Sequence, residues 1–322
     1  PGIYTVEVAV IEGGTAYTSE QSFAWGVLAL NVNKSSYTPG ETVTVGVGVL
    51  DDNGATLCDS SVTLRVTDPH GTVSTYSTTA GTVTVSEMCA NKSVTDLPDY
   101  RAEFSAGPDG EYTLEATAVT ANGERTIRKT FTVDSNPSYV IERLGSMRIY
   151  PVAEYTMRLR VTATEPFRGS VTEYIPADFI VTHLSHRGSA SDGPEADTIT
   201  WPLDLEAGET VAVSYTYDAP DISPELYLLG PADIGDASSN TIWSEPHRWQ
   251  IASDELTIDD SVNTNPSQVN TAPNTVFTDP DTGYIFFIDQ TTQDIVYRKT
   301  TDGGASWSDI VTVTDNITEA WV

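Results

Sequence analysis

Lysine is scarce in this chain of 322 residues: it occurs only at positions 34, 92, 129 and 299. Forty-six aspartate and glutamate residues face sixteen lysines and arginines, which gives a formal net charge of −30. Such a charge repels nucleic acid, so a phosphate-binding role is excluded and no nucleic-acid partner is expected. We interpret the acidity as a means of solubility in an exposed, saline setting; the alternative is that the carboxylates collect divalent cations.

Long apolar runs are also missing. No stretch of 18 apolar residues occurs, so we expect no membrane span in this segment. The chain begins inside a strand pattern at Pro1 and ends at Val322 inside another pattern. We therefore expect both ends to continue in a longer polypeptide.

Cysteine occurs only twice, at Cys58 and Cys89, which lie 31 residues apart. Two cysteines without a third ligand nearby exclude a zinc site of the usual kind. A pair in one small secreted-type domain most simply forms a disulfide, although two free buried thiols are the alternative. Closing this loop would stabilise the domain by about 3–4 kcal/mol in the chain-entropy description.

What the chain has in abundance is alternation of valine and threonine, which favours β-strands. The segment 2–10 reappears as 110–118, and Phe23 and Phe131 hold matching places in the strand that follows, at a constant offset of 108 residues. This period suits an immunoglobulin-like sandwich of about 100 residues. In such a sandwich the Gly-x-Tyr of Gly110 and Tyr112 stands where a tyrosine corner would form.

A second kind of pattern begins near residue 275. The octapeptide Thr300 to Trp307 fits Ser/Thr-x-Asp-x-Gly-x-Ser/Thr-Trp, in which the aspartate accepts backbone N–H bonds across a tight turn. The two glycines permit positive φ there, and the tryptophan packs beneath the turn. This segment resembles the bacterial-neuraminidase-repeat (Asp-box) propellers, including those of sialidases. The resemblance implies structural roles for five residues: Thr300, Asp302, Gly304, Ser306 and Trp307.

Four further segments, 23–31, 37–41, 94–100 and 243–254, carry a resemblance that extends over nearly the whole chain. They resemble large multidomain surface proteins of candidate-phylum bacteria. Pro39-Gly40-Glu41, followed by a valine-rich strand, also looks like macroglobulin-type and bacterial Ig-like domains. The thioester motif of the macroglobulins is absent from the sequence, which speaks against protease trapping. The family implies an extracellular, cell-surface location and a sandwich architecture.

These patterns together predict an all-β protein: tandem Ig-like β-sandwiches followed by the first blade or blades of an Asp-box β-propeller. We assign residues 1–25 to the last hairpin of an upstream Ig-like sandwich and 26–134 to a sandwich with one disulfide. Residues 135–253 are assigned to a second β-sandwich that acts as a spacer. Residues 254–322 are assigned to a linker and the first, incomplete blade of the propeller.

Candidate binding and modification sites are few. Calcium is the one cofactor considered, at the acidic turns that contain Asp51, Asp52, Asp279 and Asp281. Asn33, Asn91 and Asn316 lie in Asn-x-Ser/Thr sequons, which matter only in a host that glycosylates. Lys34 is the best candidate for an intramolecular lysine–asparagine isopeptide bond. We interpret Arg148, which precedes Ile149-Tyr150-Pro151, as the beginning of an ordinary strand rather than as a substrate-binding arginine.

No catalytic motif is present, so we expect no enzyme activity from these residues. The predicted function is that of a structural or adhesive segment: a stiff stalk, or part of a surface layer or filament, that presents a propeller. Expected partners are the neighbouring domains of the same polypeptide, further copies of the chain, and glycans or cell-surface ligands. The alternatives are a non-catalytic stalk for a glycan-cleaving, sialidase-like propeller and a filament subunit that assembles by strand exchange.

Overall fold

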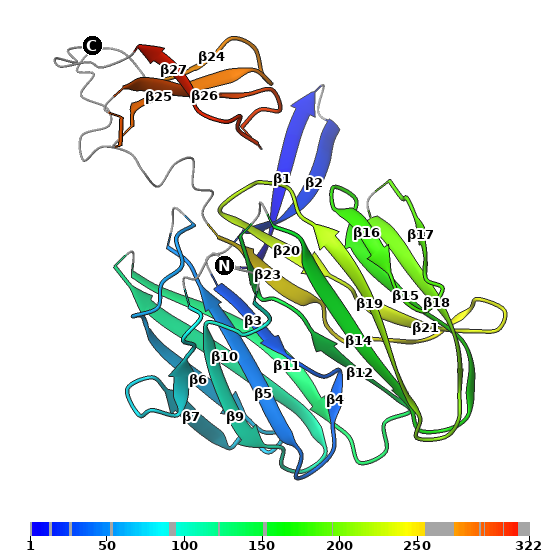
Figure 1. Cartoon of the computed structure of the whole chain (residues 1–322). Helices are drawn as coiled ribbons and strands as arrows, with labels where there is room; N and C mark the ends of the chain where they lie inside the picture. Colours follow the sequence, from blue (N-terminus) through cyan, green and yellow to red (C-terminus); the bar gives the residue numbers. More distant parts are fainter. Residues whose placement is uncertain are drawn as a thin grey trace. The chain divides into compact units, whose positions relative to one another are not determined.

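The computed structural model of the chain is all-β (Figure 1). It describes residues 2–12, 15–25, 28–51, 54–89, 95–121, 123–150, 153–194, 196–254, 274–289, 291–292, 294–304 and 306–314. Across these residues the structure has no helix, and its sheets are open rather than closed into a barrel. The chain divides into two compact units, one formed by 1–219 with 223–255 and the other by 220–222 with 256–322.

The first two strands repeat a hairpin found later in the chain. Strands β1 (Gly2–Glu12) and β2 (Thr15–Trp25) pair with each other in a two-stranded antiparallel sheet. Strands β10 (Gly110–Thr120) and β11 (Gly123–Val133) have the same lengths and the same register, 108 residues further on. The sequence repeat is therefore also a repeat of backbone structure.

The first module, residues 28–133, consists of two facing sheets. One sheet has the order β3-β5-β9-β8 and the other the order β4-β11-β10-β6-β7, with a parallel pairing between β4 and β11. The additional strands are β3 (Leu28–Val32), β4 (Ser36–Tyr37), β5 (Thr42–Val49), β6 (Ser61–Thr67), β7 (Val73–Ser77), β8 (Val83–Val85) and β9 (Tyr100–Ser105). Alternate residues of both sheets meet in a single apolar core, as the valine-rich alternation predicts.

Tyr112 fixes one end of this core. The Tyr112 hydroxyl donates a hydrogen bond to the carbonyl of Pro108, four residues upstream, at 3.0 Å. Its ring stacks on that of Phe131, with 4.9 Å between ring centroids. The Gly-x-Tyr pattern thus forms the tyrosine corner that the sequence predicts.

The second module, residues 139–254, contains three sheets around one core. Their orders are β12-β14-β19-β16, β17-β18-β15-β21-β22 and β13-β23-β20. The strands are β12 (Tyr139–Leu144), β13 (Arg148–Ile149), β14 (Tyr155–Ala163), β15 (Phe167–Pro176), β16 (Ile180–Leu184), β17 (Ser189–Ser191), β18 (Ala196–Leu205), β19 (Thr210–Asp218), β20 (Glu225–Leu229), β21 (Ala232–Asp236), β22 (Thr241–Ser244) and β23 (Trp249–Ser253). Apolar alternation locates β14, β15, β18 and β19 in the sequence but gives no sign of the short third sheet.

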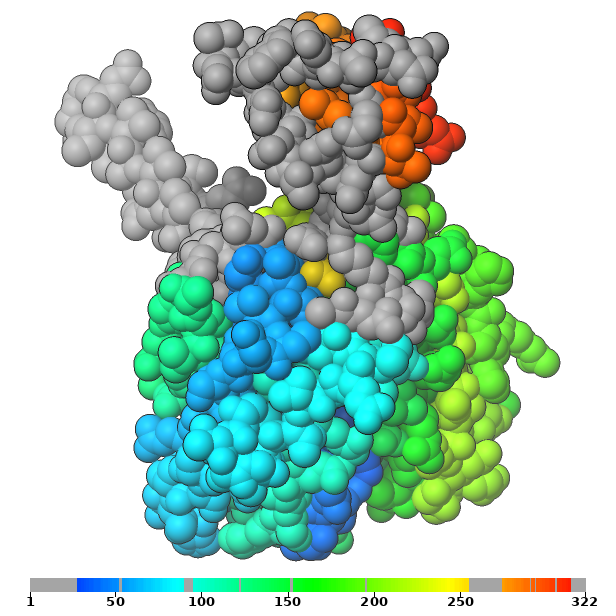
Figure 2. All heavy atoms as spheres, turned by 60° about the vertical axis from the view of Figure 1, so that its left-hand side comes forward, coloured from blue at the N-terminus to red at the C-terminus, as the bar shows by residue number. Residues whose placement is uncertain are grey.

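The two modules belong to the same compact unit, and they share core residues. Ala29 and Leu50 of the first module are fully buried among the apolar residues of the second module. In the space-filling view the atoms of the two modules adjoin, with the first module in blue and teal and the second in green and yellow (Figure 2). The modules therefore meet in an apolar contact as well as in the polar contacts described below.

The described residues between 274 and 314 in the second unit form one antiparallel sheet. Its order is β24-β25-β26-β27, and its strands are β24 (Thr275–Phe277), β25 (Gly283–Ile288), β26 (Ile295–Thr300) and β27 (Val311–Thr314). The rings of Tyr284, Phe286 and Tyr297 contact one another on this sheet. The four strands form a meander, and their assignment to a propeller blade stays a prediction.

In the part of the chain that the structure describes, no helix is long and apolar enough to cross a membrane.

Candidate functional site: the junction between the two modules

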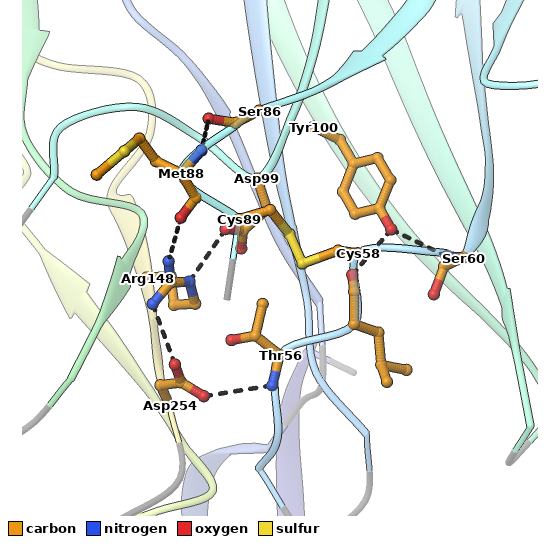
Figure 3. Close-up of a disulfide and its surroundings, with 11 residues drawn as sticks. Thr56, Cys58, Ser60, Ser86, Met88, Cys89, Asp99, Tyr100, Arg148 and Asp254 are labelled. Atoms are coloured by element: carbon orange, nitrogen blue, oxygen red, sulfur yellow. Dashed lines mark hydrogen bonds and ion pairs between the residues drawn. A yellow bond between two sulfur atoms is a disulfide. The ribbon is translucent and has the colours of Figure 1, made fainter. Parts of the chain in front are cut away.

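Arg148 is the centre of the junction between the modules. It lies on β13, the short strand that pairs in parallel with β23. Its Nε donates to Asp99 Oδ1 of the first module at 3.0 Å, and its Nη1 donates to Asp254 Oδ2 at 3.0 Å (Figure 3). Its Nη2 also donates to the carbonyl oxygen of Met88 at 3.3 Å. One guanidinium thus joins its own strand to Met88 and Asp99 of the first module and to Asp254.

The charged groups of this contact are buried. The side chains of Arg148, Asp99 and Asp254 are each about 2–3% exposed. Burial raises the pKa of Asp99, and the Arg148 charge opposes that rise. Buried ion pairs add little net stability compared with apolar packing, but removing one partner is costly because a buried charge is left uncompensated. The contacts of Arg148 with Asp99 and Asp254 therefore favour the observed docking of the two modules over other arrangements.

A second set of contacts is made by the backbone. The segment 33–35 runs antiparallel to β12, where Ser35 N donates to Ile141 O at 2.8 Å and Arg143 N donates to Asn33 O at 2.7 Å. The Ser35 hydroxyl accepts a further bond from Ile141 N at 2.9 Å. Because backbone hydrogen bonds demand a fixed register, this pairing aligns the first module with the edge of the second.

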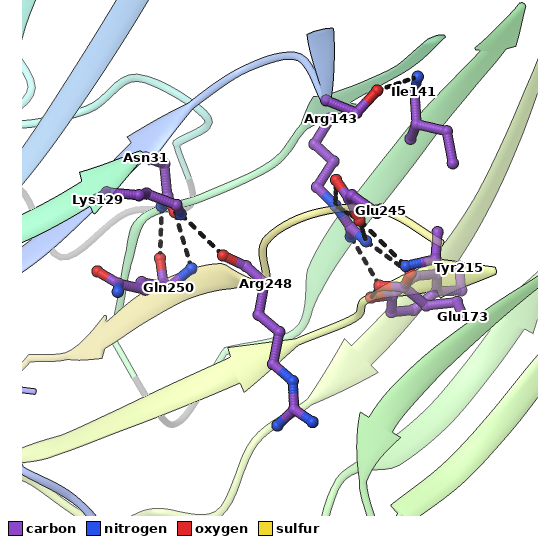
Figure 4. Close-up of polar contacts among 11 residues, drawn as sticks. Asn31, Lys129, Ile141, Arg143, Glu173, Tyr215, Glu245, Arg248 and Gln250 are labelled. Carbon is purple, nitrogen blue, oxygen red and sulfur yellow. Dashed lines mark hydrogen bonds and ion pairs between the residues drawn. The ribbon is translucent and has the colours of Figure 1, made fainter. Parts of the chain in front are cut away.

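A third set joins β3, β11 and β23 (Figure 4). The carboxamide of Asn31 pairs with the backbone of Gln250: Asn31 Nδ2 donates to Gln250 O at 2.7 Å, and Gln250 N donates to Asn31 Oδ1 at 2.9 Å. Lys129 Nζ donates to Leu30 O at 3.2 Å, to Asn31 Oδ1 at 3.0 Å and to Arg248 O at 2.8 Å. Burial lowers the pKa of Lys129 to about 7.

Steric fit completes the junction. Met147, 3% exposed, packs against the backbone of Gly46 on β5. A Cβ atom at position 46 would collide with Met147 Sδ and with Pro98 Cβ, so only glycine allows the approach. The indole Nε1 of Trp249 donates to Ser146 O at 2.9 Å, which holds the segment before β13 in place.

A buried charge cluster supports the second module next to the junction. Arg143 on β12 pairs with Glu173 on β15 at 2.7 Å and with Glu245 at 2.5 Å, and all three side chains are at most 1% exposed. The Tyr215 hydroxyl donates to Glu173 Oε1 at 3.1 Å. Burial raises the pKa of Glu173. Burial also acts to raise the pKa of Glu245, but the charge and hydrogen bonds of Arg143, together with the His247 charge and the Ala232 amide, outweigh it and lower that pKa.

The disulfide lies beside the Arg148 contacts (Figure 3). Cys58 and Cys89 are bonded, with their Cα atoms 5.8 Å apart, as the sequence predicts. Cys89 follows directly after Met88, whose carbonyl oxygen accepts the bond from Arg148. The cross-link thus fixes a segment that contributes to the junction.

The Asp302 turn is held by its own side chains. Asp302 Oδ1 accepts bonds from the Thr300 hydroxyl at 2.6 Å and from Ser306 N at 2.9 Å, and its Oδ2 accepts one from the Ser306 hydroxyl at 2.5 Å. Gly303 and Gly304 have φ values of 75° and 103°. Hydrogen bonds from Ser306 and Thr300 lower the Asp302 pKa to about 2. Trp307 is half-buried. The Asp-box assignment of this turn stays a prediction.

We expect Asp302→Ala to loosen this turn. The Ser306 amide loses its acceptor, so its hydrogen exchange should become at least severalfold faster, whereas substitution of the exposed Asp309 by alanine should leave it unchanged. Because the folded pKa lies below the ordinary value of 3.8, the Asp302 contribution is complete above that value and is lost as the pH falls towards 2. NMR-detected exchange at Ser306 across this pH range checks both points; equal exchange in Asp302→Ala and the unaltered chain would contradict them.

The remaining predicted sites show local contacts. Asp51 Oδ1 accepts a bond from Ala55 N, and Asp279 Oδ1 accepts bonds from Asp281 N and Thr282 N, so these carboxylates brace their own turns. No group of three or more histidine, cysteine or acidic side chains within the described residues is arranged to hold a metal ion. Calcium binding stays a prediction, and Asp52 lies outside the described residues.

The structure describes the surroundings of one of the three sequons, at Asn33, and of Lys34. The Asn33 carboxamide donates to Glu142 Oε1 and accepts from the Tyr37 hydroxyl, contacts that a glycan on its nitrogen would disturb. Asn91 and Asn316 lie outside the described residues. Lys34 forms an ion pair with Glu41, so the isopeptide candidate from sequence has a carboxylate rather than an asparagine as its partner.

Sequence reasoning missed most of the junction. Arg148 does begin a strand, as predicted, but its role in joining the modules was not anticipated. Arg143, Glu173, Glu245 and Lys129 were not singled out either. The available signal was the placement of Arg143 and Arg148 in short apolar segments, where an unpaired charge would be costly.

Comparisons with known proteins give weak structural likenesses. No protein-family profile and no curated protein matches the sequence. A DUF4785 family protein from Legionella pneumophila aligns with 74% of this chain and 62% of its own, at 13% identity and a TM-score of 0.25. A Salmonella alpha-2-macroglobulin mutant aligns with 78% of this chain and 18% of its own, at 12% identity and a TM-score of 0.28.

An Escherichia coli alpha-2-macroglobulin activated by porcine elastase aligns with 79% of this chain and 24% of its own, at 13% identity and a TM-score of 0.25. This chain therefore spans less than two thirds of each of the three proteins. At these scores the similarity assigns no family and no function.

Proposed function

We propose that this chain is a structural segment of a large extracellular, cell-surface protein, in which the two joined modules act as a rigid spacer. The observation that supports this proposal best is the buried Arg148 contact with Asp99 and Asp254. Adjacent domains of one chain usually move relative to each other unless their interface is extensive. Here buried charges, backbone pairing and shared apolar residues all act against such motion.

Other features fit the same role. The disulfide is typical of proteins exposed to an oxidising environment outside the cytosol. The net charge of −30 favours solubility of an extended surface protein and disfavours non-specific association. The β1–β2 hairpin has the same strand lengths and the same register as the β10–β11 hairpin. We therefore assign it to a further module of the same kind. We propose that the second unit begins an Asp-box propeller that the spacer presents to glycans or other surface ligands, and that this chain itself has no catalytic role.

The rigidity of the junction can be measured as a distance distribution. Spin labels are placed on the full chain through Ser74→Cys and Ser191→Cys, which lie on exposed strand positions of the first and second module. Pulsed electron spin resonance should give one narrow distribution. In an Arg148→Met background the distribution should broaden, because the buried Asp99 and Asp254 lose their shared partner.

Two controls separate hinge motion from unfolding. A label pair within the first module, at Ser74→Cys and Thr84→Cys, should keep a narrow distribution in the Arg148→Met background. Arg168→Met, which removes an exposed ion pair with Asp204, should leave the inter-module distribution unchanged. A broad distribution between the modules of the unaltered chain would show that the spacer is hinged, and the proposal would fail.

A further inference from the structure

The first and last strands of the first module meet at one lysine and one asparagine. Asn31 lies on β3, Lys129 lies on β11, and Lys129 Nζ is 3.0 Å from Asn31 Oδ1 (Figure 4). Asn31 is 1% exposed. Lys129 is half-buried, and its ammonium group donates to three oxygens, those of Leu30, Asn31 and Arg248. The amine and the carboxamide are therefore held in contact with each other at the junction between the modules.

From this arrangement we propose that Lys129 and Asn31 form an intramolecular isopeptide bond, with release of ammonia. Lys129 Nζ attacks Asn31 Cγ, so that a bond forms between Nζ and Cγ while the bond between Cγ and Nδ2 breaks. The proton that Nζ gives up goes to Nδ2, which leaves as ammonia. Nothing is oxidised or reduced, and no co-reactant is needed.

The carboxamide is held in a reactive orientation by the second module. Gln250 N donates to Asn31 Oδ1 at 2.9 Å, so this N–H can stabilise the negative charge that develops on that oxygen during attack. Gln250 O accepts from Asn31 Nδ2 at 2.7 Å, which fixes the plane of the amide. Both contacts come from β23, so the site is complete only when the second module is docked on the first.

The amine is also disposed to react. The nucleophile is the neutral amine, and its fraction rises as the pKa of a lysine falls towards neutrality. Burial lowers the pKa of Lys129 to about 7; the Glu245 charge opposes this shift and the Arg143 charge adds to it. A substantial share of Lys129 is therefore neutral at ordinary pH, unlike a lysine in water.

The site differs from the candidate that sequence alone suggested. Lys34 is paired with the Glu41 carboxylate and not with an asparagine. Lys129 instead faces neutral oxygens of Leu30, Asn31 and Arg248. A bond there would tie the first strand of the module to its last strand, and both to the surface on which the second module docks.

The test is an intact-mass measurement on the full chain after reduction of the disulfide. The chain, incubated at mildly alkaline pH, should be lighter than its sequence mass by one ammonia. In a tryptic digest the peptides that contain Asn31 and Lys129 should be joined, and cleavage after Lys129 should be lost, since trypsin does not act on an acylated lysine.

Three variants make the result specific. Lys129→Arg keeps the positive charge but cannot form the bond, so its mass should equal the sequence mass; Asn31→Leu should do the same. Lys34→Arg should keep the loss of ammonia, because Lys34 takes no part. An unaltered chain that has the full sequence mass after prolonged incubation would overturn the proposal, as would a loss of ammonia that persists in Lys129→Arg.

Discussion

Replacing Arg143 by methionine should lower the free energy of unfolding by about 3–5 kcal/mol, because two carboxylates then remain buried without a cation. Glu173 and Glu245 are both at most 1% exposed, and each receives two or more hydrogen bonds from the guanidinium. Water cannot reach these groups to replace the lost bonds. Urea unfolding of Arg143→Met beside the unaltered chain measures the difference, provided that both unfold in one transition for this unit.

The loss should shrink as the pH falls. Burial already raises the pKa of Glu173 while Arg143 is present, and removal of the cation raises it further. The folded variant then binds more protons than its unfolded chain in the acid range, so lowering the pH stabilises it relative to the original. A destabilisation of the same size at neutral and acid pH would mean that lost packing, rather than uncompensated charge, is the cause.

Two matched variants sharpen this result. Arg168→Met removes an arginine from an ion pair in which the two side chains are 79% and 71% exposed, so it should cost at most about 1 kcal/mol. The triple substitution Arg143→Met, Glu173→Leu and Glu245→Leu should recover much of the loss, because apolar side chains of similar volume can replace a buried ion cluster. If the triple variant were as unstable as Arg143→Met, the cluster would matter through its shape and not through its charge.

The fold could be predicted from the sequence where strands alternate and where the chain repeats itself. The apolar side chains of Leu114, Ala116 and Ala118 on β10 point into the core at every second position, so their pattern is visible in sequence. The disulfide could be predicted because only one pairing of two cysteines exists. The offset of 108 residues predicts the β1–β2 hairpin, whose register matches that of β10 and β11.

The junction could not be predicted, because its partners are far apart in the chain. Asn31 contacts Gln250, 219 residues later, and Arg148 contacts Asp254, 106 residues later. Such pairs have no shared period or motif, and 46 acidic residues offer too many partners for each arginine. The third sheet was missed for the same reason, since β13 has two residues and finds its partner strand β23 only in three dimensions.

The second large effect is expected at the disulfide. The double substitution Cys58→Ala and Cys89→Ala should lower the free energy of unfolding by about 3–4 kcal/mol, because opening a 31-residue loop restores conformational entropy to the unfolded chain. Part of the effect should come from the folded state. Without the bond, the segment that ends at Cys89 is less restrained, and its Met88 carbonyl oxygen is the third acceptor of Arg148.

These two contributions can be separated by combining substitutions. If the disulfide acts only on the unfolded chain, its loss and that of Arg148→Met should add within about 0.5 kcal/mol. If it also positions Met88 for Arg148, the double-mutant cycle should show coupling, because Arg148→Met has already removed that contact. Stability is followed by urea unfolding and junction geometry by the Ser74–Ser191 label pair. We expect coupling, together with a broader distance distribution in the chain that lacks the disulfide; strict additivity with an unchanged distribution would restrict the effect of the disulfide to the first module.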